Sequence, residues 1–108
     1  MNDARNQPQP ASRQSPTLTT RERASLKARA HGLEPVVRIG HAGLTDASAD
    51  AIGRALDAHE LIKVKLGEGD RDERAVVTEA IRAKTGAALV QQVGRVLVLW
   101  RPRPAEDA

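Results

Sequence analysis

The sequence contains no cysteine and almost no aromatic residues, and both absences narrow the range of possible functions. Without cysteine, the chain cannot form disulfides, thiolate metal sites or a cysteine nucleophile. Trp100 is the only aromatic residue among 108 residues. Proteins that stack the bases of single strands use several aromatic rings on one surface. If this chain binds nucleic acid, it must therefore do so through charge, shape and backbone contacts.

Long apolar runs are also missing. The longest run of aliphatic and aromatic residues is Val96–Trp100, which is far shorter than the roughly 20 residues that span a bilayer. The first residues, Met1–Ala4, start no apolar segment, so we expect no secretory signal and no membrane partner. A small domain without disulfides suits a reducing compartment, which predicts a cytoplasmic protein.

The composition divides the chain into one domain and two short terminal segments. Residues 1–18 are rich in Asn, Gln, Ser, Thr and Pro, and we interpret them as a disordered tail. Residues 19–102 should form the folded domain, and residues 103–108 a short C-terminal tail. This length is that of a single domain, and a monomer is the default expectation.

The periodicity of the apolar residues predicts three helices and four strands. The helices should begin after Thr19, Thr45 and Asp70. Thr19 and Asp70 each have a Glu three residues later, as in a capping box, and Thr, a common N-cap residue, stands at position 45. The strands should lie at 36–39, 61–66, 87–93 and 96–100, with the last two forming a hairpin around a Gly-Arg turn. The order predicts an α/β two-layer sandwich: an N-terminal helix followed by βαβαββ, with a four-stranded mixed sheet. Each of the two crossovers should give parallel neighbours.

The charge is unevenly distributed, although the net charge is only +3. Residues 19–41 carry five basic and two acidic side chains, whereas residues 42–80 carry five basic and nine acidic ones. Residues 81–108 carry five basic and two acidic side chains. The first helix, the first strand and the terminal hairpin are therefore basic, and the other helices are acidic. A basic surface of this kind fits an anionic partner, although an ordinary solvated surface explains it too.

A glycine-containing loop, Gly40-His41-Ala42-Gly43, follows the first predicted strand and precedes a helix. Glycines allow close approach of a ligand, and the following helix N-terminus favours an anion such as a backbone phosphate. The alternative is a strand-to-helix turn that needs glycine only for its geometry. The loop lacks the Lys-Ser/Thr of a P-loop and the G-x-G-x-x-G of a dinucleotide site.

Several segments together resemble one known family, and they cover nearly all of the predicted domain. They are Leu33–Val37, Ile39-Gly40, Gly43–Thr45, His59–Lys65, Glu79–Ile81, Thr85–Ala87 and Gly94–Pro102. This pattern resembles the CRM domain (chloroplast RNA splicing and ribosome maturation), most closely its YhbY-like, single-domain bacterial members. The resemblance implies a fold similar to the C-terminal domain of translation initiation factor three. It also implies an RNA-binding protein that associates with ribosomal RNA in precursors of the large ribosomal subunit.

The resemblance assigns the RNA-contacting loop to Gly40, His41, Ala42 and Gly43. His41 departs from the family, which commonly has Lys there, so the loop should carry less positive charge near neutral pH and binding could depend on pH. The family often has Tyr where this chain has Trp100, which we interpret as a packing residue. The candidate basic surroundings of the loop are Arg21, Arg23, Lys27, Arg29 and Arg38. Lys63 and Lys65 alternate along a strand and either line an RNA-facing sheet surface or keep a half-exposed sheet soluble.

The sequence offers no constellation for catalysis, so we expect no enzyme, no cofactor, no metal site and no small-molecule substrate. Its three histidines lie in separate elements without the spacing of a zinc site, and His59 is expected to be partly buried. Two other functions stay open. The acidic residues Asp46, Asp50 and Asp57 could dock a basic ribosomal protein, or the chain could be a small-subunit translation factor, which fold similarity alone suggests.

Overall fold

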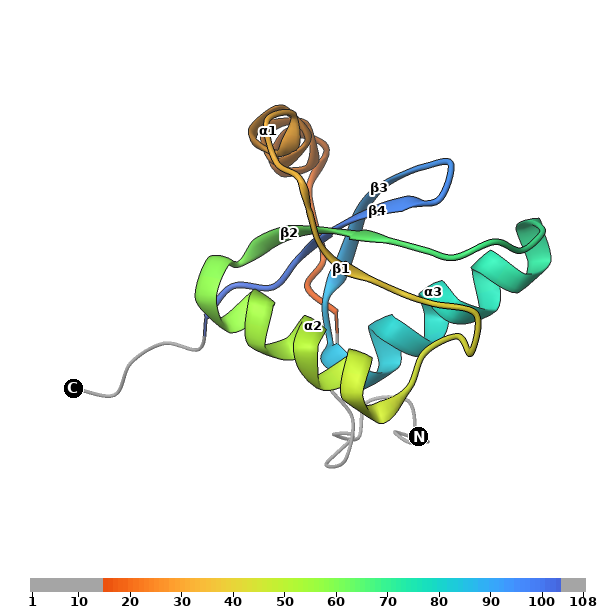
Figure 1. Ribbon diagram of the computed structural model, residues 1–108. Helices are drawn as coiled ribbons and strands as arrows, with labels where there is room; N and C mark the ends of the chain where they lie inside the picture. The colour runs from red at the N-terminus through yellow and green to blue at the C-terminus, as the bar shows by residue number, and fades with distance from the viewer. Residues whose placement is uncertain (1–14, 104–108) are drawn as a thin grey trace, which may run out of the picture.

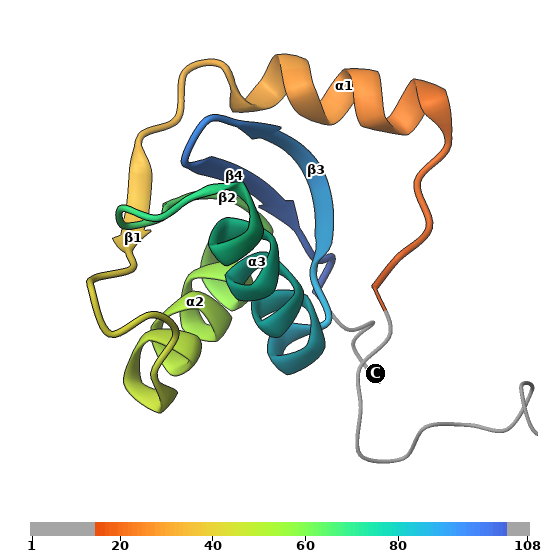
Figure 2. The same cartoon turned by 90° about the vertical axis from the view of Figure 1, so that its right-hand side faces the viewer.

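The structure, a computed structural model, describes residues 15–103 as three helices around one four-stranded sheet (Figure 1). The helices are α1 (Thr20–Ala30), α2 (Asp46–His59) and α3 (Arg71–Thr85). The strands are β1 (Pro35–Arg38), β2 (Leu61–Lys65), β3 (Ala88–Val93) and β4 (Val96–Trp100). This confirms the predicted α/β class and element order. Figure 2 shows α2 and α3 together on one side of the sheet and α1 on the other.

Local sequence signals account for where the helices begin. The capping boxes predicted ahead of α1 and α3 are both present. α2 also begins with a reciprocal box, in which Ser48 takes the place that Glu holds in the other two. Each box satisfies amide groups that the first turn of a helix leaves without partners.

The helix ends are less uniform. α3 ends at Gly86, whose φ of 73° is the left-handed conformation that glycine adopts without strain. α2 ends instead at Glu60, whose φ of 67° and ψ of −41° lie outside the left-handed helical region, and this conformation strains a non-glycine residue by about 1 kcal/mol or more. His59, expected to be partly buried, is exposed because it lies in the last turn of α2, beside this cap.

The order of the strands in the sheet is β1-β2-β4-β3, which corrects one expectation. The first crossover does give parallel neighbours, β1 and β2. The second does not, because β4 lies between β2 and β3 and pairs antiparallel with both. The hairpin therefore returns β4 into the gap between the two parallel strands, where both its edges are hydrogen-bonded.

The sheet has an apolar layer on each face. The larger layer is formed by Ile62 and Val64 of β2 and Leu97 and Leu99 of β4, packed against α2 and α3. The smaller layer packs Leu26 and Ala30 of α1 on Leu61, Val90 and Val98. Trp100 is half-buried against this second layer, which confirms its interpretation as a packing residue. α1 thus adds a partial third layer to the predicted sandwich.

The ends of the described chain contact the domain. Of the predicted tail 1–18, residues 1–14 lie outside the described residues. The Ser15 hydroxyl donates to the Ala87 carbonyl at 2.7 Å, and Leu18 packs against the layer under α1. Arg103, in the predicted C-terminal tail, donates to two carbonyls at the end of α2; residues 104–108 lie outside the described part.

Candidate nucleic-acid interface

The glycine loop is a tight turn between β1 and α2. The amide of Gly43 donates to the Gly40 carbonyl at 3.1 Å, and Gly43 has a φ of 76°. His41 and Ala42 lie at the corner of this turn and are exposed, and their amides have no acceptor among the described residues. The turn therefore leaves two backbone donors without a partner among the described residues, and a phosphate contact needs such donors.

The two glycines of the loop have different reasons to be glycine. Gly43 needs its positive φ, which strains any other residue. Gly40 has no positive φ, and a Cβ built there would meet nothing within 4 Å. The fold itself therefore does not require glycine at position 40, whereas close approach of a ligand would explain it.

A second loop, residues 67–69 between β2 and α3, lies against the glycine loop. A Cβ at Gly67 would come within 2.9 Å of the Ile39 carbonyl oxygen and 3.2 Å of that of Gly40. Such contacts are closer than side chains tolerate, so the glycine allows the two backbones to touch. Between the two loops and the start of α3 is a cleft of about 320 Å³.

Three basic side chains lie on the sheet face opposite to α2 and α3, and two of them, Arg38 and Lys65, are at the strand ends next to the glycine loop. Arg38 pairs directly with Lys65 in the parallel register of β1 and β2, and Lys63 lies two residues earlier on the same face. Arg38 is exposed and both lysines are half-exposed. We call Arg38, Lys63 and Lys65 the strand-end basic cluster. Like charges on directly opposite residues destabilise a sheet.

No carboxylate in the described chain neutralises this cluster. The ion pairs between described residues join Arg82 to Glu79, Lys84 to Asp46 and Arg101 to Asp57, all on the side of α2 and α3. An anion bound across the ends of β1 and β2 would offset the repulsion between Arg38 and Lys65. Lys63 and Lys65 can line an RNA-facing surface only if helices cover the opposite face of the sheet. The helices α2 and α3 do cover that face.

The basic residues of α1 do not form one surface. Arg23 donates through Nη1 to the carbonyls of Leu89 and Val90, at 2.8 and 2.7 Å, and so ties α1 to β3. Lys27 lies one turn later on the same flank and is half-exposed. Arg29 lies on the opposite flank, beside Val36, and Arg21 is exposed away from the buried stripe. Only part of this helix's charge can therefore act with the strand-end basic cluster.

The N-terminus of α2 contributes less than the sequence suggested. Asp46 occupies its first turn, and this carboxylate already interacts favourably with the helix dipole. Asp46 also lies 3.6 Å from Lys84. An anion at the glycine loop would consequently depend on the loop amides and on the neighbouring Arg38 and Lys65.

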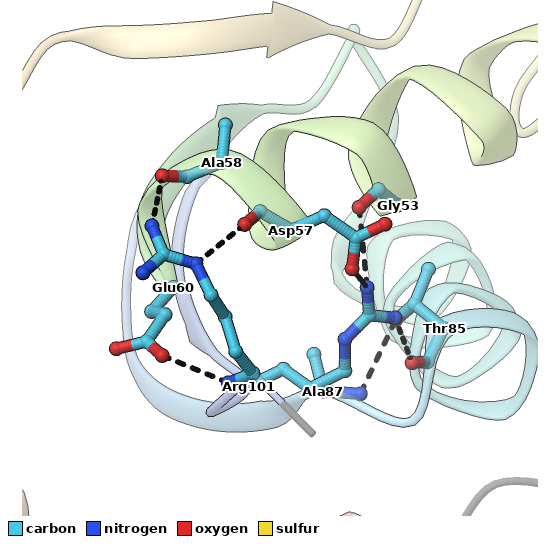
Figure 3. A network of polar contacts seen from close by, with 8 residues as sticks. Gly53, Asp57, Ala58, Glu60, Thr85, Ala87 and Arg101 are labelled. Carbon is cyan, nitrogen blue, oxygen red and sulfur yellow. Dashed lines mark hydrogen bonds and ion pairs between the residues drawn. The ribbon is translucent and has the colours of Figure 1, made fainter. Parts of the chain in front are cut away.

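The basic C-terminal residues also serve the fold. Arg101 donates to the Thr85 carbonyl at 2.6 Å, the Gly53 carbonyl at 3.1 Å and the Asp57 carboxylate at 2.7 Å. Figure 3 shows this guanidinium between α2 and the end of α3. Arg103 donates to the carbonyls of Asp57 and Ala58 in the last turn of α2. The positive charge of residues 81–108 is thus largely placed beside the acidic helices, and not on the hairpin as the sequence suggested.

Two arginines that we did not predict as site residues lie beside the end of β2 or in the cleft. The Arg95 carbonyl accepts a bond from Leu66, which places the hairpin turn beside the end of β2. Arg74 lines the cleft and donates to the Gly69 carbonyl at 2.9 Å. Neither has a local sequence signal, because only the strand order and the two-loop contact bring them to this edge.

Within residues 15–103, no group of three or more His, Asp or Glu side chains is arranged to hold a metal ion. No helix in the same range is long and apolar enough to cross a membrane.

Comparison with known proteins decides the family. The family model described as the CRS1/YhbY (CRM) domain matches residues 18–101. The chain belongs to this family. The CRM domain described here is 46% identical over 86 residues to a Haemophilus influenzae protein named "RNA-binding protein", covering 80% of this chain and 87% of that one. It is also 33% identical over 84 residues to a Bacillus subtilis protein named "Probable RNA-binding protein YqeI", covering 78% and 88%.

The fold of this CRM domain is also found among solved structures. The solution structure of a hypothetical protein from Staphylococcus aureus matches with a TM-score of 0.70 and 27% sequence identity. The match covers 84% of this chain and 93% of that one. The family resemblance noted in the sequence is thereby confirmed, and so is the fold class.

Proposed function

We propose that this CRM domain binds ribosomal RNA in precursors of the large ribosomal subunit and acts there as an assembly factor. RNA as the ligand is supported by the names of the relatives. The observation that carries the proposal is the strand-end basic cluster, which lies without carboxylate partners among the described residues, directly beside the glycine loop. The large-subunit target rests on the family resemblance.

The proposed contact is with the sugar-phosphate backbone. The exposed amides of His41 and Ala42 donate to phosphate oxygens, while Arg38 and Lys65 supply charge-assisted bonds from the adjoining strand ends. Lys63 and Lys27 extend the positive surface toward α1. Phosphate contacts position a protein on structured RNA without reading its sequence, which suits a chain with a single, packed tryptophan.

The alternative of a protein-docking acidic surface is weakened by the ion pairs. Asp57 bonds Arg101, and Asp46 lies near Lys84. Two of the three carboxylates of the proposed docking surface therefore already have partners within the fold. Charge reversal at Asp57 would also damage the domain. Reversal of Asp50 alone is the better test of that alternative, since a docking partner should be lost while RNA binding is kept.

Sucrose-gradient fractionation of a cell lysate tests the proposal directly. We expect the protein to migrate with free or immature large subunits at low salt and to leave them at high salt. The Arg38→Gln/Lys65→Gln variant should stay at the top of the gradient, whereas Arg54→Gln/Lys84→Gln, which removes the same charge from the other side, should still migrate. Migration with small subunits would favour a translation factor instead, and absence from every particle at low salt would overturn the proposal.

A further inference from the structure

The cleft beside the glycine loop is the feature that phosphate binding leaves unexplained. It is lined by the loop 40–43, by the loop 67–69 and by Arg74, Val76 and Val77 of α3. Its volume of about 320 Å³ is within the range of small-ligand sites. Val76 is 69% exposed here, the largest value among the large apolar side chains of the described residues.

The charges of the cleft argue against a phosphate inside it. Glu68 and Glu73 line it together with a single guanidinium, that of Arg74. Two carboxylates near one cation give no net attraction for an anion, in contrast to the strand-end basic cluster on the neighbouring surface. An uncharged, partly apolar occupant fits this lining.

We infer that the cleft receives one unpaired nucleobase of the RNA whose backbone crosses the glycine loop. This inference rests on the proposed function and adds the kind of RNA: a strand with an extruded or bulged nucleotide, not a continuous duplex. Unpaired bases in RNA are recognised by stacking on side-chain planes and by hydrogen bonds to their edges.

The walls of the cleft provide both kinds of contact. Arg74 is held by its bond to the Gly69 carbonyl, and its Nε is buried without a partner among the described residues. A guanidinium fixed in this way is a stacking surface, and Val76 and Val77 supply the apolar wall. The open space at Gly40 lets the nucleotide's backbone approach, so that its base can turn into the cleft.

The test uses two versions of a short RNA hairpin, one with a bulged nucleotide and one with an abasic residue at the bulge. The abasic RNA keeps every phosphate but lacks the base. We expect the wild-type protein to bind the bulged RNA about fivefold more tightly. Signals of the Val76 and Val77 methyl groups should shift in NMR spectra with the bulged RNA and not with the abasic RNA.

Variants localise the effect. Val76→Gln should remove most of the difference between the two RNAs while keeping affinity for the abasic one. Val93→Gln is the matched control, because Val93 is 61% exposed and does not line the cleft, and it should preserve the difference. Equal affinity of the wild type for both RNAs would overturn this inference and leave the proposed function standing. Binding of neither RNA would count against the proposed function itself.

Discussion

The two sides of the sheet use basic residues in opposite ways. On the side of α2 and α3, Arg101, Arg82 and Lys84 face carboxylates of the same domain. On the other side, Arg38 and Lys65 at the ends of parallel strands, and Lys63 in the middle of β2, have no described carboxylate as partner. The comparison teaches that the number of basic residues in a segment says little about binding. Whether their charge is already neutralised within the fold is more informative.

The largest effect should come from neutralising the strand-end basic cluster. Arg38→Gln/Lys65→Gln should weaken RNA binding on the order of 100-fold, about 3 kcal/mol, because two charge-assisted bonds are lost. The slope of log affinity against log salt should flatten by roughly 0.7 to 0.9 for each contact. Fluorescence anisotropy over a salt series measures both, and Arg54→Gln/Lys84→Gln provides the control. Equal losses in the two double variants would mean that the two sides do not differ.

Arg101→Ala tests the other side of the comparison. Its side chain is only 12% exposed and bonds two carbonyls and the Asp57 carboxylate. We expect the free energy of unfolding to fall by about 2 kcal/mol, measured by urea denaturation. RNA affinity of the folded protein should be unchanged under stabilising conditions. A loss of affinity without loss of stability would instead place Arg101 in the interface.

Gly40→Ala separates ligand approach from backbone strain. A Cβ there meets no protein atom, so stability should be kept or rise slightly through the unfolded state. RNA affinity should fall about fivefold, or roughly 1 kcal/mol, because the methyl group stands where the RNA backbone passes. Gly53→Ala, in the middle of α2, is the control that should raise stability and leave binding alone. Thermal unfolding and anisotropy on both variants decide the matter.

His41→Lys should give the smallest change, and in the opposite direction. A full positive charge at the exposed corner of the loop should tighten RNA binding about threefold near neutral pH, roughly 0.6 kcal/mol. The salt dependence should steepen by roughly 0.7 to 0.9, as expected for one added phosphate contact. An unchanged salt slope would show that residue 41 does not face a phosphate.

The sequence predicted those parts of the fold that depend on residues close together in the chain. The capping boxes at Thr19 and Asp70 predicted the starts of two helices correctly. The strand order was not accessible in this way, because nothing in the pattern of residues 87–100 shows that β4 inserts between its neighbours. The end of α2 at Glu60 was equally hidden, since a non-glycine residue adopts a positive φ of this kind only when its surroundings impose it.

In the candidate site, too, local features could be predicted from the sequence and features that depend on tertiary contacts could not. The glycine loop is contiguous in sequence, so its residues could be named in advance. Lys65 could also be named from its alternation with Lys63, but its pairing with Arg38 depends on strand register. Arg74 and Gly67 depend on contact between two loops, which no local pattern encodes. Arg23 illustrates the reverse: it belongs to a basic helix by sequence, yet its guanidinium bonds the backbone of β3.

That last contact bears on how the protein behaves at high concentration. β3 is an edge strand, and unpaired edges invite pairing with other molecules and aggregation. Arg23 and Ser15 occupy the carbonyls of Leu89, Val90 and Ala87 along this margin. We therefore expect α1 and the segment that leads into it to hinder the pairing of β3 with strands of other molecules. The opposite margin, β1, carries the charge of Arg38, so a residue proposed to bind RNA would also help to keep the domain soluble before it reaches its target.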